Sequence, residues 1–109
     1  MANVKETAVD ILNRYLDSAF ENGLFATENL LDVKFVEHLW TSEFTIDGCK
    51  VSHEFYIVSE QRSGIINLDM CVIVPDGQKS EALTLAKFYF KYLSVNTLAS
   101  AIAAIVERT

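Results

Sequence analysis

The fold is decided by residues 40–74, WTSEFTIDGCKVSHEFYIVSEQRSGIINLDMCVIV, in which apolar and polar side chains largely alternate. A period of two is typical of β-strands with one buried face. Asp47 and Gly48 interrupt the alternation, and this pair favours the type I′ turn of a two-residue hairpin. The residues predicted to face each other across this hairpin are Ile46 with Cys49, Phe44 with Val51, Ser42 with His53, and Trp40 with Phe55.

A second turn is predicted over residues 59–64, and we expect all six residues to form the loop. The next pairs would then be Ile57 with Ile66, Phe55 with Leu68, His53 with Met70, and Val51 with Val72. Both turns place the apolar side chains on one face of the sheet. A slip of one residue would move a strand's apolar set to the other face, whereas a slip of two would leave the faces unchanged. Pro75 ends the third strand because it has no N–H to donate.

The residues before the sheet predict a helix from Val4, because apolar side chains recur there every three or four positions up to Phe20. Asn3 would cap this helix and Gly23 would end it. Residues 27–39 fit two interpretations, a helix capped by Thr27 or a strand. We favour a helical turn followed by extended chain.

The segment after Pro75 is predicted to be helical, because residues 80–107 contain no Pro or Gly. It would form one long helix or two helices joined at residues 94–97, with Asn96 or Thr97 capping the second. One apolar stripe would face the sheet. A second, aromatic-rich stripe on this helix is typical of an interface unless the chain covers it internally, and it comprises Leu85, Phe88, Tyr89, Tyr92 and Val95.

Together these elements predict one α+β domain over residues 1–109. It would be a two-layer fold, a three- or four-stranded antiparallel meander with the N-terminal and C-terminal helices packed on one face. A chain of 109 residues that is 50% hydrophobic and 22% charged is large enough to bury such a core. The element order and acidic balance resemble those of secretion-chaperone-like proteins, a likeness of architecture that carries no residue roles.

Charge and motifs argue against several classes of function. A net charge of −6 disfavours binding to nucleic acid or to an anionic membrane. Neither a secretory signal nor a membrane span is evident. The spacing of Cys49 and Cys71 fits neither a redox motif nor a zinc site, so we expect a cytoplasmic protein without metal or cofactor. No phosphate-binding or hydrolase motif is found, and we assign no catalytic residue.

The opposite face of the predicted sheet carries Thr41, Glu43, Thr45, Lys50, Ser52, Glu54, Tyr56, Asn67, Asp69, Cys71 and Ile73. In the expected register Glu54 faces Asp69 and Glu43 lies diagonally adjacent, so three carboxylates would meet. We interpret this face as solvated first, as a negative patch for a partner second, and as a cation or acid–base site third. His53 is the titratable group of the apolar face, where we expect a neutral imidazole bonded to a hydroxyl.

The sequence favours a non-enzymatic protein-interaction module, an adaptor or chaperone-like holder that is dimeric. The residues expected to bind the partner are Leu85, Phe88, Tyr89, Tyr92 and Val95 on the helix, and Glu43, Glu54, Asp69 and Tyr56 on the sheet. One alternative is an acidic inhibitor or immunity-type protein that blocks a basic enzyme. Another is an enzyme that binds a small ligand or metal on the carboxylate face.

Overall fold

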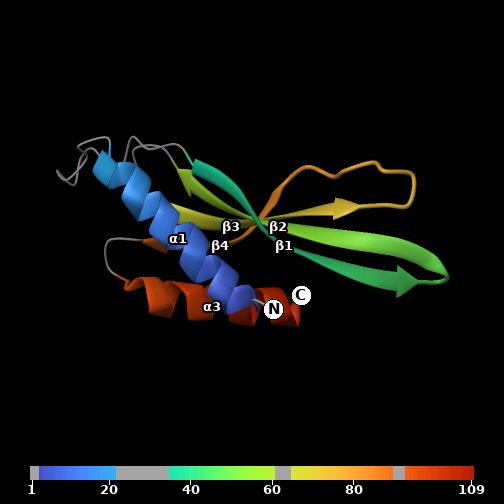
Figure 1. The fold of residues 1–109 in the computed structure, drawn as a ribbon. Coiled ribbons are helices and arrows are strands. Elements are labelled where there is room, and N and C mark those ends of the chain that lie inside the picture. Colours follow the sequence, from blue (N-terminus) through green and yellow to red (C-terminus); the bar gives the residue numbers. More distant parts are fainter. Residues whose placement is uncertain (1–2, 22–34, 61–64, 90–92) are drawn as a thin grey trace.

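The computed structural model describes residues 3–21, 35–60, 65–89 and 93–109. The elements are α1 (Val4–Glu21), β1 (Phe35–Ile46), β2 (Cys49–Glu60), β3 (Ile65–Ile73), β4 (Leu83–Tyr89) and α3 (Val95–Arg108). The strands form one antiparallel sheet in the order β1-β2-β3-β4, and α1 and α3 lie together on one of its faces (Figure 1). The predicted α+β meander with terminal helices is confirmed.

The first hairpin has the predicted register, with Ile46 opposite Cys49 and Trp40 opposite Phe55. Asp47 and Gly48 both have positive φ, 51° and 78°, as a type I′ turn requires. The register shifts between His38 and Trp40, so Leu39 forms a bulge. β1 begins at Phe35, so the helix alternative is wrong for residues 35–39, whereas the extended chain favoured at the end of this segment is confirmed. Residues 27–34 and Gly23 lie outside the described residues.

The second predicted register is wrong by two residues. Ile57 faces Leu68, Phe55 faces Met70, and His53 faces Val72. The strands remain paired as far as Glu60 and Ile65, so four positions rather than the expected six separate the paired residues. Every side chain keeps its predicted face, because the alternation in a strand has a period of two.

The predicted helix after residue 80 is also wrong for residues 83–89, which form β4. Ile66 and Leu68 on β3 face Phe88 and Ala86 on β4. Pairing with β4 satisfies the outer N–H and C=O groups of β3, an element whose core side chains are almost fully buried. The tertiary structure thus overrides the local preference for helix in a segment that contains no Pro or Gly.

The predicted cap of α1 is confirmed, whereas the cap of α3 is a different residue from those predicted. Asn3 caps α1 as predicted, because its side-chain oxygen accepts a hydrogen bond from the Glu6 N–H at 2.8 Å. Ser94 caps α3, where its hydroxyl accepts from the Thr97 N–H at 3.1 Å. The prediction of Asn96 or Thr97 as the cap is therefore wrong, and α3 begins at Val95.

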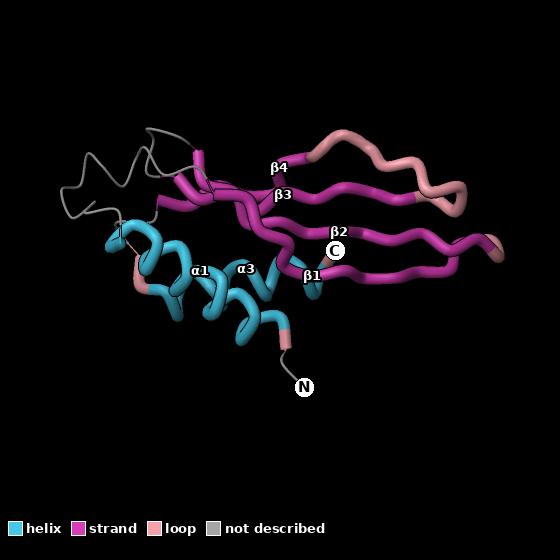
Figure 2. Tube along the Cα trace, turned by 45° about the horizontal axis from the view of Figure 1, so that its top comes forward, coloured by secondary structure: helices cyan, strands magenta, loops and turns pink. Residues whose placement is uncertain are grey.

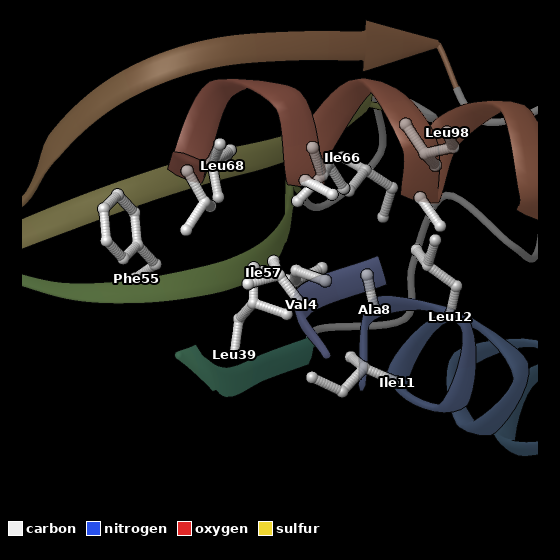
Figure 3. Packing of buried hydrophobic residues seen from close by; sticks show 14 of the residues in the cluster. Val4, Ala8, Ile11, Leu12, Leu39, Phe55, Ile57, Ile66, Leu68 and Leu98 are labelled. Carbon is white, nitrogen blue, oxygen red and sulfur yellow. The ribbon is translucent and has the colours of Figure 1, made fainter. Parts of the chain in front are cut away.

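The core lies between the helix pair and one end of the sheet (Figure 3). Its fully buried side chains point toward one another from α1, α3 and the three strands β1, β2 and β3. They include Ala8, Ile11, Leu12, Leu39, Phe55, Ile57, Ile66, Leu68, Leu98 and Ile102.

The helices are too short to cover the sheet along its whole length. At 1.5 Å per residue, α1 with 18 residues is about 27 Å long and α3 with 14 residues about 21 Å. β1 and β2 have 12 residues each and span about 40 Å. Figures 1 and 2 show the turn of the first hairpin projecting well beyond the helix layer. The sheet therefore has a covered end and a bare end.

Candidate functional site

The bare end presents apolar side chains on the same face that the helices cover elsewhere. Alternation from buried Phe55 assigns these residues to the helix side, and Ile46 and Leu83 are 57% and 59% exposed. The others are half-buried. We name this surface the bare strip. It comprises Phe44, Ile46, Val51, His53 and Val72, together with Leu83, which lies on the outer strand β4 in the same row as Met70 and Phe55.

His53 lies among the aromatic rings of the bare strip. Its ring centroid is 4.8 Å from that of Phe44 and 6.4 Å from that of Phe55. The imidazole Nδ1 is buried and has no hydrogen-bond partner, so the predicted bond to a hydroxyl is not made at this nitrogen. His53 faces Ser42 as predicted, but its neighbour on β3 is Val72 rather than Met70.

A groove lies at the inner end of the bare strip, where the helix ends meet β1. Its volume is about 470 Å³. It is lined by Asn3 and Val4 from the start of α1, by Trp40, Ser42 and Phe44 from β1, and by Val106, Glu107 and Thr109 from the end of α3. The groove therefore offers apolar walls with a carboxylate among its lining residues.

The opposite face carries a hydrogen-bonded network. Tyr56 donates to the Glu54 carboxylate at 2.7 Å, and Lys79 donates to the Tyr56 hydroxyl at 2.7 Å. The Lys79 ammonium also lies 3.0 Å from Glu54 and 4.8 Å from the centroid of the Tyr56 ring. Lys79 belongs to the connection between β3 and β4, so the network ties this connection to β2.

The network shifts the pKa values of its members. Hydrogen bonds from Tyr56 and Lys79 hold the pKa of Glu54 below its ordinary value. The hydrogen bonds to Tyr56 and Glu54 raise the pKa of Lys79. The hydrogen bond from Lys79 lowers the pKa of Tyr56, but the bond to Glu54 and burial outweigh it, so the pKa of Tyr56 is raised. The network therefore holds Glu54 and Lys79 as an ion pair.

The predicted cluster of three carboxylates is wrong. The slip of two residues places Cys71 opposite Glu54 and Tyr56 opposite Asp69. Asp69 instead accepts a hydrogen bond from Thr84 at 2.8 Å. Glu43 lies 3.9 Å from the exposed ammonium of Lys50. Among the described residues, no group of three or more His, Cys, Asp or Glu side chains could hold a metal ion.

The open face is less polar than expected. Val36 is 56% exposed there. A shallow hollow of about 320 Å³ is lined by Val36, Tyr56, Val58, Asp69, Cys71, Lys79 and Ala82. Apolar side chains therefore line the hollow together with the ion pair of Glu54 and Lys79.

Two contributors to the open face were missed by the sequence patterns. Lys79 follows the Pro75 turn, where the connection pairs with the end of β3, and its side chain reaches Tyr56 on β2. His38 bonds to the Thr41 hydroxyl at 2.7 Å and lies edge-on to Tyr56, with ring centroids 5.6 Å apart. No signal in the sequence pairs Lys79 with Glu54, because the two residues are brought together by the tertiary structure alone.

The aromatic stripe does not exist as a helical surface. Leu85 and Phe88 lie on β4 and pack partly buried against the core. Tyr89 is 56% exposed, and Val95 is the first residue of α3. Tyr92 lies outside the described residues. The residues expected to share one helix face are thus divided between a strand and a helix.

Comparison with protein-family models, with curated proteins and with solved structures finds no match to this chain. Within the described ranges, neither helix combines the length and the apolar character needed to cross a membrane.

Proposed function

We propose that this chain is a non-enzymatic protein-binding module that holds a partner protein against the bare strip. The observation that carries the proposal is that the helix layer ends partway along the sheet while the apolar alternation continues. Contiguous exposed apolar surface on a small protein commonly marks an interaction site. Phe44 and Trp40 supply aromatic contact area at its inner end, as interfaces favour.

The shape of the surface favours a protein over a small ligand. The bare strip crosses four strands and is open to solvent, whereas small-molecule sites are usually enclosed. Glu54 is engaged by Lys79 and Tyr56, and Asp69 faces Tyr56 rather than Glu54. These observations support an adaptor or chaperone-like holder.

The negative charge of the chain favours a partner with basic residues. The chain carries a net charge of −6, and the exposed Glu107 lines the groove at the inner end of the bare strip. A partner segment that combines apolar with basic residues would satisfy both the strip and this carboxylate. Cys49 and Cys71 are free thiols, which is compatible with a cytoplasmic location.

The test compares two variants of the full chain that differ only in the face they change. Ile46→Glu places a charge on the bare strip, and Thr45→Glu places the same charge one residue away on the opposite face. Both positions are exposed near the hairpin turn, so we expect both variants to keep the fold. Tagged chains are used to capture proteins from an extract of the native cell, and captured proteins are quantified by mass spectrometry.

We expect Ile46→Glu to reduce capture of a specific partner at least tenfold, while Thr45→Glu retains it. Equal retention by both variants, or loss in Thr45→Glu alone, would contradict binding at the bare strip. Circular dichroism of each variant verifies that the sheet is intact.

A further inference from the structure

β1 is an edge strand of the described sheet and borders the bare strip. Its inner side pairs with β2, and the outer side of its N–H and C=O groups forms no ladder with any described strand. The bulge at Leu39 leaves residues 40–46 as the regular segment of this edge. That segment contains no Pro, Lys or Arg, and Glu43 is its one charged residue. Among the described residues, this edge is therefore available for pairing with a further strand.

We propose that two copies of this chain join through antiparallel pairing of their β1 edges, about a two-fold axis that passes through Ser42 perpendicular to the sheet. The proposal rests on the proposed function, because it assigns a second copy to the border of the same bare strip. Such an axis keeps the helix layers of the two copies on the same side of one continuous eight-stranded sheet.

The side chains of β1 select this register. A perpendicular axis places each residue opposite one from the same face, so the axis must coincide with a residue position. With Ser42 on the axis, Trp40 of each copy faces Phe44 of the other, which forms two aromatic pairs on the helix side. On the open side, Thr41 faces Glu43 of the second copy.

Neighbouring registers are poorer. An axis at Glu43 would set two carboxylates directly opposite each other, which is destabilising. An axis at Thr41 would place Trp40 opposite Ser42 and lose both aromatic pairs, and an axis at Phe44 would leave Trp40 opposite the turn at Gly48. In the Ser42 register Glu43 is the charged side chain of the overlap, and it faces a hydroxyl. The net charge of −6 is therefore not concentrated at the junction.

The pairing also explains the length mismatch between sheet and helices. Because the two β1 strands run in opposite directions, the helix layer of each copy lies beside the projecting hairpin of the other. Each bare strip then has one wall from its own helix ends and a second from the helices of the other copy. The groove lined by Trp40, Ser42 and Phe44 lies at the axis. A second copy thus converts two open strips into two grooves for a held segment.

The experiment uses cysteine cross-linking in the full chain. Ser42→Cys is introduced together with Cys49→Ser, which removes the exposed thiol. Opposed Cα atoms in an antiparallel pair are about 4.5–5.5 Å apart, within the range for a disulfide. We expect mild oxidation to convert most of this variant to a covalent dimer of twice the 12.2 kDa chain mass.

The matched control is Ile46→Cys with Cys49→Ser. In the Ser42 register this exposed residue lies about 26 Å from its counterpart in the second copy, so the control stays uncross-linked under the same oxidation. Sedimentation equilibrium of the unmodified chain is expected to give the dimer mass, and Ser42→Lys is expected to give the 12.2 kDa monomer with an unchanged circular dichroism spectrum.

A monomeric unmodified chain, or cross-linking of Ile46→Cys as efficient as that of Ser42→Cys, would overturn the proposal. A monomer that still captures a partner in an Ile46-dependent way overturns self-pairing alone and leaves the proposed function standing. A dimer whose capture is indifferent to Ile46→Glu overturns the proposed function and supports the pairing.

Discussion

The two ends of the sheet have the same alternation of side chains but different surroundings. At the covered end, Phe55 and Ile57 are fully buried beneath α1 and α3. At the bare end, the same apolar face continues to Phe44, which is half-buried, and to Ile46, which is 57% exposed. The comparison teaches that the pattern of a strand identifies a face, whereas its burial depends on how far the covering helices extend.

The largest expected effect is on stability, and it compares a buried ring at the covered end with a half-buried ring at the bare end. Phe55→Ala removes a ring that is fully buried and should lower the free energy of unfolding by about 3–5 kcal/mol. Phe44→Ala removes a half-buried ring from the bare strip and should cost about 1 kcal/mol. Urea unfolding followed by circular dichroism measures both. Equal losses would show that the bare end is as well covered as the core.

A smaller effect concerns the helix that covers the core. Ser94→Ala removes the hydroxyl that accepts from the Thr97 N–H and should lower stability by about 1 kcal/mol. Asn96→Ala, two residues further on, is the control and should change stability by less than about 0.5 kcal/mol, because Asn96 is exposed within the first turn. The reverse order of the two losses in thermal unfolding would reassign the cap to Asn96.

The smallest effect lies on the open face and depends on pH. The pKa of Glu54 is lowered in the folded chain from its ordinary 4.5, so its ionised form adds stability above that value. This contribution disappears as the pH falls through the folded pKa. Glu54→Gln should therefore be less stable than the unmodified chain at pH 7, with a difference that shrinks below pH 4.5. Denaturant titrations at pH 7, 5 and 3 measure the trend.

Tyr56→Phe serves as the companion variant, because it removes one of the two hydrogen bonds to Glu54 while keeping the ring. It should show the same trend with a smaller amplitude. A difference between the Gln variant and the unmodified chain that grows in acid would contradict the assigned direction of the pKa shift.

Prediction from the sequence succeeded where short-range chemistry decided the outcome. Asp47 and Gly48 select a turn, and this turn sets every pair of the first hairpin as far as Trp40. Asn3 caps α1 through a bond that spans three positions. The second turn lacked such a signal, and the resulting slip of two residues separated Glu54 from Asp69. The carboxylates lie on the predicted face, but the shifted register gives Glu54 a different partner, so the expected site does not form.

The sequence by itself determined which side chains share a face, because alternation depends only on the period of the strand. It also determined the turn at Asp47 and the class of the fold. Only the tertiary structure decided that residues 83–89 form β4, since the open edge of β3 supplies the hydrogen bonds that make a strand there favourable. The tertiary structure likewise decided that Lys79 reaches Glu54 and that helices of 18 and 14 residues leave one end of the sheet bare. These features depend on contacts between distant segments, which local patterns do not encode.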